Sequence, residues 1–137
     1  MPIIQMKVST PAAAAPAPRA IADTVVRLTA EILRKRPDLT AVTIDMVPAT
    51  HWFVAGPSLA EQGKASFFLD IKIVDGTNTK DEKAAYVAAI FAAMADLLGD
   101  LHPESYVYVH DVRAEAYGFG GRTQEHRYIA GRLSQAA

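Results

Sequence analysis

The stretch Ser66-Phe67-Phe68-Leu69-Asp70-Ile71-Lys72-Ile73-Val74 decides the fold. Its side chains alternate at period two between a wholly apolar set and a set that contains Asp70 and Lys72, which is the pattern of a β-strand with two different faces. Thr79-Lys80-Asp81-Glu82 follows in the form of a capping box, and apolar residues at helical spacing continue to a stop at Gly99. Tyr106–Val112 predicts another strand. The second half of the chain is therefore predicted to fold as strand, helix, strand.

The first half repeats this order at an offset of 65 residues without a gap. Pro2–Val8 and Ala41–Val47 predict strands, and Arg19–Arg36 predicts the helix between them, after a proline-rich loop at Pro11–Pro18. Few of the aligned pairs are identical, so chance hydrophobic agreement is the alternative for any one of them. The interpretation is one domain, 1–137, with an internal repeat of 1–64 and 65–129 and a short tail, 130–137.

Two strand–helix–strand units imply an α/β (α+β) fold, because each parallel strand pair needs a crossover helix. The predicted architecture is a four-stranded sheet with two helices on one face. The other face is expected to carry apolar side chains, such as one of the two sets on Ser66–Val74, with no third layer to cover them. The sequence therefore predicts self-association.

Composition narrows the classes of protein. The chain has 137 residues, with 14 Lys and Arg against 15 Asp and Glu, so it lacks the basic excess that nucleic-acid binding requires. No apolar run approaches the roughly 18 residues that span a bilayer, and the N-terminal residues do not resemble a signal peptide. There is no cysteine. We expect a soluble cytoplasmic protein that binds neither nucleic acid nor membrane.

Three features together resemble the tautomerase superfamily, whose type member is 4-oxalocrotonate tautomerase. They are Pro2 directly after Met1, the β-α-β unit, and the closing segments Trp-Phe-Val-Ala-Gly-Pro-Ser-Leu-Ala-Glu (52–61) and Tyr-Gly-Phe-Gly-Gly (117–121). The resemblance covers nearly the whole chain. It implies a fused two-unit member, which forms a homotrimer with a barrel-like core. It also implies an isomerase: a cofactor-independent keto–enol tautomerase that acts on a small 2-oxo or 2-hydroxy-dienoate acid.

The resemblance makes Pro2 the general base, through the secondary amine that it presents once Met1 is removed. An α-amino group titrates near 7.7–8.0 in model peptides, and a desolvated pocket or a neighbouring cation disfavours its protonated form. A neutral amine at that pKa suits proton transfer between carbon and oxygen. The alternative is that proline follows Met1 by chance, at a base rate of about 5%.

The chain departs from the family where the family places arginine. The loops after the first and third strands read Ser-Thr-Pro-Ala (9–12) and Asp-Gly-Thr-Asn (75–78), and the mid-strand arginine is replaced by Thr43 in one half and Tyr108 in the other. Tyr108 can donate a hydrogen bond to a developing enolate. The cations left as candidates for the arginine roles are Arg113, Arg122, Arg127 and Lys72. The alternatives are a solvated strand end for Arg113, a polar exposed or interchain segment at 122–127, and an interface ion pair for Lys72.

The resemblance also suggests substrate-binding aromatics. Trp52 and Phe53 are similar to the aromatic wall that the family places beside the proline, and Tyr117 is the repeat counterpart of Trp52. Plain packing is the alternative for all three. The four histidines show no metal-ligand spacing, so neither a metal nor another cofactor is predicted.

Two further functions stay open. One is a related haloacrylate dehalogenase, hydratase or decarboxylase, which needs an acid to activate water, with Glu115 and Asp111 as the first candidates. The other is a non-catalytic trimeric binding protein. The missing arginines favour the binding protein, and the retained Pro2 disfavours it.

Overall fold

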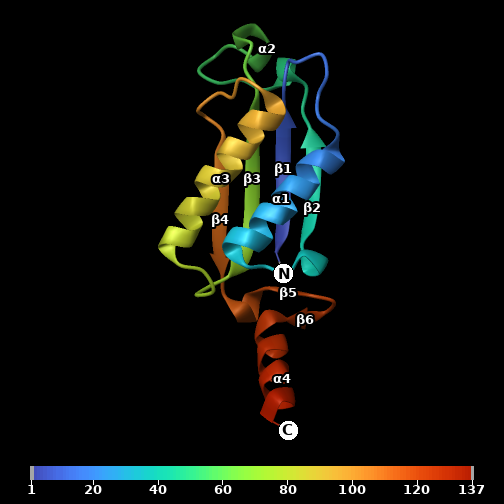
Figure 1. Ribbon diagram of the computed structural model, residues 1–137, viewed down its shortest axis with the longest axis vertical. Helices are drawn as coiled ribbons and strands as arrows, with labels where there is room; N and C mark the ends of the chain where they lie inside the picture. Colours follow the sequence, from blue (N-terminus) through green and yellow to red (C-terminus); the bar gives the residue numbers. More distant parts are fainter. Residues whose placement is uncertain (1, 137) are drawn as a thin grey trace.

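The computed structural model describes residues 2–136 and shows one four-stranded sheet with two long helices on one face (Figure 1). The strand order is β2-β1-β3-β4, and α1 and α3 are the two covering helices. The bounds are β1 (Ile3–Ser9), α1 (Pro18–Leu33), β2 (Ala41–Met46), β3 (Ser66–Val74), α3 (Lys80–Leu98) and β4 (Tyr106–Val112). The predicted fold class is confirmed.

The strand pairing is the same in both halves of the chain. β1 pairs with β2 in parallel, with Ile3 opposite Ala41, and β3 pairs with β4 in parallel, with Phe68 opposite Tyr106. The central pair, β1 with β3, is antiparallel. The two halves thus pair through β1 and β3, which run antiparallel at the middle of the sheet. This arrangement is compatible with a duplicated unit. The duplication itself stays a prediction.

The core lies between the sheet and the two helices. The apolar set of β3 (Phe67, Leu69, Ile71 and Ile73) is almost completely buried there. From α3, the side chains of Ile90 and Met94 are fully buried against it. The alternation read from the sequence therefore assigns the helix-covered face of β3 correctly.

The helix ends follow local chemistry. Thr79 Oγ1 accepts a hydrogen bond from the Glu82 amide at 3.1 Å, and the Glu82 carboxylate accepts one from the Thr79 amide at 2.8 Å, so the predicted capping box of α3 is present. α1 ends at Leu33, three residues before the predicted Arg36. The helix stops early because Arg34 adopts a left-handed conformation (φ 59°), with its backbone N–H directed to the Thr29 carbonyl.

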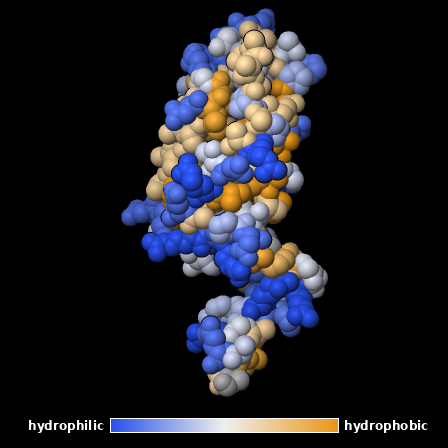
Figure 2. Space-filling view, turned by 45° about the vertical axis from the view of Figure 1, so that its right-hand side comes forward, coloured by the Kyte–Doolittle hydropathy of each residue, from blue (hydrophilic) through white to orange (hydrophobic). Residues whose placement is uncertain are grey.

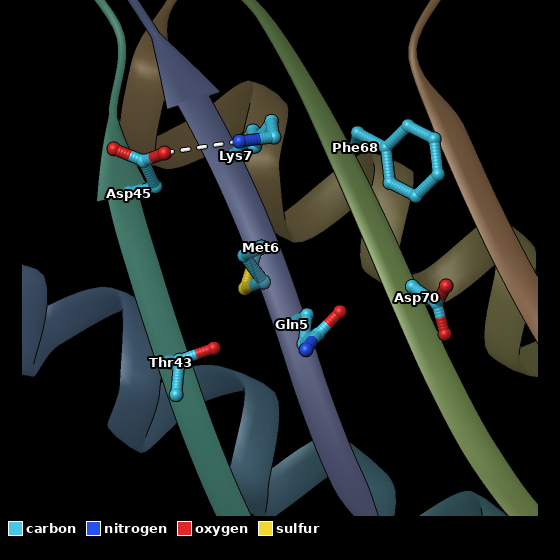
Figure 3. Close-up of a pocket in the computed structure, with 7 residues that line it drawn as sticks. All are labelled: Gln5, Met6, Lys7, Thr43, Asp45, Phe68 and Asp70. Carbon is cyan, nitrogen blue, oxygen red and sulfur yellow. Dashed lines mark hydrogen bonds and ion pairs between the residues drawn. The ribbon is translucent and has the colours of Figure 1, made fainter.

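The uncovered face of the sheet differs from the prediction. We expected an apolar surface, but β1 and β2 present Gln5, Lys7, Thr43 and Asp45 there, and Lys7 Nζ lies 3.0 Å from Asp45 Oδ2 (Figure 3). The reason is that the apolar sets of β1 and β2 are used under the helices, which leaves their polar sets outside. Over β3 and β4 the open face does carry large apolar rings, because Phe68 contacts Tyr106 and Tyr108 there and both tyrosines are at least half exposed.

The end of the chain is also more ordered than the predicted tail. After β4, a short hairpin of β5 (Gly118–Phe119) and β6 (Arg122–Thr123) leads into α4 (Gln124–Ala136). This helix stands apart from the body (Figures 1 and 2), and none of its described residues is buried. A shorter helix, α2 (Leu59–Gln62), lies at the opposite end of the molecule. Within residues 2–136, no helix is long and apolar enough to cross a membrane.

A buried phenol links α1 to α3. Thr29 Oγ1 donates to the Val25 carbonyl at 2.7 Å, so the hydroxyl of Tyr86, 2.8 Å away, is the donor in the bond between Tyr86 and Thr29. Burial raises the pKa of Tyr86 to about 12. The folded state therefore holds the phenolic proton to a higher pH than the unfolded chain does.

This bond predicts a loss of stability in alkali. Because the folded pKa is raised, the contribution of Tyr86 is complete below pH 10 and disappears as the pH rises from 10 to 12. At pH 11 the free energy of unfolding should fall by about 1.4 kcal/mol through this group. Urea unfolding of wild type and Tyr86→Phe at pH 8 and pH 11 measures it: the variant should lose less stability. Equal losses in both proteins would contradict the assignment.

Candidate active site at the start of the central strand

Pro2 lies at the start of β1, in the middle of the sheet. Its carbonyl accepts a hydrogen bond from the Ala41 amide at 3.1 Å, and the residue is buried, as Ile4 and Met6 are. Since Ile3 and Gln5 are more exposed, Pro2 continues the set of side chains that faces the helices. Pro2 therefore belongs to the helix-covered face, at the end of the sheet where β3 and β4 finish.

The register identifies the neighbours of Pro2 on that face. Ile3 is opposite Lys72, so continuing the antiparallel register by one position places Pro2 opposite Ile73, whose partner on β4 is Asp111. The Asp111 carboxylate lies 2.6 Å from Lys83 Nζ of α3. Asp111, one of the two acids considered for water activation, thus lies at the same end and on the same face as Pro2, two strands away, in an ion pair.

A cation reaches this end from α1, in the absence of the family arginine. Lys35, just beyond α1, donates from Nζ to Thr77 Oγ1 at 2.9 Å, in the loop after β3. Asn78 of the same loop donates to the Leu33 carbonyl at 3.0 Å, which holds the loop against the end of the helix. Burial lowers the pKa of Lys35, and the charges of Glu82 and Asp111 partly oppose this effect. Lys35 thus stands where sequence reasoning found no cation.

Tyr117 closes the same end of the sheet. Its hydroxyl donates to the Lys72 carbonyl at 3.3 Å, and its ring is half-buried. Burial raises the pKa of Tyr117, although hydrogen bonds with Gln124 and with the backbone of Ile3 lower it. The phenol is therefore protonated at neutral pH, and its single proton is directed to the Lys72 carbonyl. Of the three predicted wall aromatics, Tyr117 is the one that the structure brings to the start of β1.

Trp52 and Phe53 lie elsewhere. They follow β2, whose last residue, Met46, pairs with Val8 near the far end of β1. With about 3.3 Å per strand residue, they are roughly 20 Å from Pro2. Within one chain they do not form the wall beside the proline, and this expectation is corrected. The sequence comparison failed because the two closing segments follow strands that run in opposite directions.

The predicted arginines lie around the closing hairpin. Arg113 is exposed at the end of β4, and its Nε lies 2.8 Å from Glu115 Oε1, so the second acid considered for water activation is also ion-paired. Arg122 lines a cavity of about 390 Å³ together with Tyr117 and other hairpin residues. Arg127 stacks 3.7 Å from the centre of the Phe119 ring and donates to its carbonyl, so its contacts hold α4 to the hairpin.

A cluster on the open face was missed by sequence reasoning. Asp70 accepts from Lys72 Nζ at 3.0 Å, and its other oxygen lies 3.2 Å from His110 Nε2. The His110 ring stacks on Tyr108, with 4.7 Å between ring centroids. The signal was present in the sequence, since Asp70 and Lys72, like Tyr108 and His110, are two residues apart in a strand. The cluster places Lys72 in an intrachain ion pair on the face opposite to Pro2.

Tyr108 is more than half exposed on this open face, at 54% of its full accessibility, and stacks on Phe68 as well as His110. It pairs with Asp70, which pairs with Gln5, so Tyr108 is three register positions and two strands away from Pro2. Within one chain its hydroxyl does not reach the start of β1. Among residues 2–136 there is also no group of three or more side chains suited to hold a metal ion.

Comparisons with known proteins agree with this fold. A model of the tautomerase enzyme family matches residues 68–127. The wild-type symmetric trimer of Q0 fused 4-OT superposes with a TM-score of 0.74 over 90% of this chain and 96% of that chain, at 16% identity. The chain carries the tautomerase fold, and the resemblance to the tautomerase superfamily is confirmed.

Two other solved structures show the range of chemistry on this tautomerase fold. Native fused 4-OT is 23% identical, with a TM-score of 0.71 over 89% of this chain and 97% of that chain. N1, a member of the cis-3-chloroacrylic acid dehalogenase family, is 24% identical, with a TM-score of 0.67 over 92% of this chain and 90% of that chain. No curated protein matches the sequence. At these identities the structures establish the fold, and the activity has to be argued from the site.

Proposed function

We propose that this tautomerase-fold protein is a cofactor-independent keto–enol tautomerase of a small 2-oxo or 2-hydroxy-dienoate acid, with Pro2 as the general base. The observation that supports it most is the convergence of Pro2 and Lys35 at the helix-covered end of the central strands. One is the source of a basic amine, and the other is a cation. This pair supplies both groups that moving a proton between carbon and oxygen requires.

The surroundings of Pro2 suit a base that is neutral near pH 7. Burial and nearby ammonium groups both disfavour the protonated form of an amine, and Pro2 is buried at the end of the sheet where Lys35 and Lys83 gather. The amine takes a proton from the carbon next to the carbonyl and returns it to the other end of the conjugated system. Lys35 attracts the negative charge that develops on the substrate.

A substrate panel tests the proposed function. Purified protein is assayed with phenylenolpyruvate, 2-hydroxymuconate and cis-3-chloroacrylate, by ultraviolet absorbance for the enols and by chloride release for the haloacrylate. We expect ketonisation of at least one enol. For the best substrate, kcat/KM should rise with pH through the pKa of the amine, and Pro2→Ala should shift that rise while keeping some activity. A pH profile unchanged in Pro2→Ala would contradict Pro2 as the base.

The panel includes a haloacrylate because Asp111 could activate the water that its dehalogenation requires. Asp111 is the acid at the Pro2 end of the sheet, on the Pro2 face, where water would have to be activated. Its carboxylate lies 2.6 Å from Lys83 Nζ, and a carboxylate is a group that can accept a proton from water. Chloride release that Asp111→Asn abolishes, without enol ketonisation, would assign the dehalogenase function instead.

Lys35 is predicted to bind and polarise the substrate. Lys35→Met should lower kcat/KM on the best enol by about 10- to 100-fold, because a half-buried cation facing the developing charge is lost. Lys35→Arg should keep most of the activity, and Lys7→Met, at the other end of β1, is the matched control. Thermal unfolding shows whether each variant is folded. Unchanged kinetics in folded Lys35→Met would exclude Lys35 from the site.

A further inference from the structure

A second cavity is lined by residues from the far end of the sheet from Pro2. This is the end at which α2 lies (Figure 1). It has a volume of about 560 Å³, and its lining residues come from the segment after β2 and from the turn before β4. These residues are Trp52, Phe53, Val54, Ala55, His102, Glu104 and Tyr106. The proposed tautomerase mechanism uses none of them.

The aromatic side of the cavity is held in place by the backbone. The Trp52 carbonyl accepts from the Leu59 amide at 2.8 Å, and the Val54 amide donates to the Pro57 carbonyl at 3.1 Å. The side-chain amide of Gln62 donates to both the Val54 and Pro57 carbonyls, at 3.0 and 3.1 Å. The loop that carries the two aromatic rings is therefore preorganised.

Two features of this loop are unfavourable for folding alone. Ala55 has a φ of 60°, a left-handed conformation that costs a residue with a side chain about 1 kcal/mol or more. Phe53 keeps 62% of its accessible surface in solvent. The loop is held rigid, contains a strained residue and exposes a large apolar ring to water. These features together indicate that the ring contacts a ligand that is absent from the isolated chain.

The opposite side of the cavity carries a carboxylate. The hydroxyl of Tyr106 donates to the Glu104 carboxylate, and the Ser66 hydroxyl donates to the Glu104 carbonyl at 3.1 Å. The Glu104 amide donates to Nδ1 of His102 at 3.0 Å, which holds the two side chains on the same turn. Glu104 is the one acidic residue among those that line this cavity, and no lysine or arginine is among them.

The combination of aromatic rings with one negative charge selects a cation. Aromatic faces attract ammonium groups through their quadrupoles, most strongly for tryptophan, and a neighbouring carboxylate adds charge attraction. A bulky alkylammonium group also covers apolar rings such as Phe53, whereas a small hydrated ion does not. The cavity is too exposed and has too few oxygen ligands from side chains for a metal ion.

We propose that this cavity is a binding site for a small organic cation with an alkylammonium head, held between Trp52, Phe53 and Tyr106 and paired with Glu104. The site is independent of the proposed tautomerase site. In the repeat alignment Trp52 corresponds to Tyr117, but the counterpart of Pro2 is Phe67, which is completely buried and has no amine. The far end therefore binds without the chemistry of the Pro2 end.

The protein contains its own reporter, because Trp52 is the single tryptophan of the chain. Choline is titrated into the full-length protein while tryptophan fluorescence is recorded, and 3,3-dimethylbutan-1-ol, its uncharged analogue of the same shape, is titrated in parallel at equal ionic strength. We expect a saturable change with choline, with a Kd in the millimolar range, and at least tenfold weaker binding of the alcohol. Equal binding of both would show an apolar slot and overturn the proposal, as would no saturation by choline.

Two substitutions test the two halves of the site. Glu104→Gln removes the charge with little change in size and should weaken choline binding about tenfold, while Phe53→Leu should weaken it by a smaller factor. Glu115→Gln, at the other end of the sheet, is the matched control and should leave binding unchanged. Thermal unfolding establishes that each variant is folded. Undiminished choline binding in folded Glu104→Gln would overturn the assignment, whatever the enol assays show.

Discussion

Protein that retains Met1 should turn over the best enol substrate at least about 1,000-fold more slowly than protein that begins at Pro2. Retention converts the ring nitrogen of Pro2 into an amide, which has no basic lone pair, whereas removal of Met1 leaves a secondary amine. Blocking N-terminal processing, with intact-mass measurement of both preparations, provides the comparison. This is the largest effect that the proposed mechanism predicts, because it removes the base and leaves every other side chain in place.

The control for this comparison is Pro2→Ala with Met1 removed, which keeps a primary amine at nearly the same position. It should retain part of the activity that the Met1-bearing protein loses. Equal turnover by the processed and unprocessed proteins would show that an amide nitrogen suffices. The proline mechanism would then be wrong, and the non-catalytic binding protein would become the better explanation for the fold.

Tyr108→Phe should lower turnover by roughly 10- to 1,000-fold, the range for loss of one donor to a developing oxyanion. Tyr108 lies on the open face, away from Pro2 of its own chain, so this effect requires the hydroxyl to reach the start of β1 in another copy. The homotrimer expected from the sequence would supply that copy. Sedimentation should give a mass of about three times 14.8 kDa.

Tyr106→Phe is the matched control, since Tyr106 lies two residues earlier on the same face of β4. It should leave turnover of the enol nearly unchanged. A folded Tyr108→Phe trimer with wild-type kinetics would remove Tyr108 from the site and leave Lys35 as the group that stabilises the enolate. A monomer at micromolar concentration that is fully active would show that one chain completes the site alone.

Much of the site depended on contacts that local patterns do not contain. Pro2 and Tyr117 were identified from the sequence, and the structure brings both to one end of the sheet. Lys35 was missed, because its partner Thr77 is 42 residues away and is reached only when α1 packs beside α3. The placement of Trp52 beside Pro2 was wrong for a single chain, because it depended on the relative direction of strands whose pairing was unknown.

By itself, the sequence determined the four strands and two long helices of the body and the two alternating faces of β3. The alternation of Ser66–Val74, the Thr79–Glu82 capping box and the 65-residue offset depend on neighbours a few positions apart, so they can be read without coordinates. Only the tertiary structure decided the antiparallel join of β1 with β3 and the charged character of the open face. Strand order is set by packing between residues that are distant in sequence. The free energy of that packing cannot be read from a local sequence pattern.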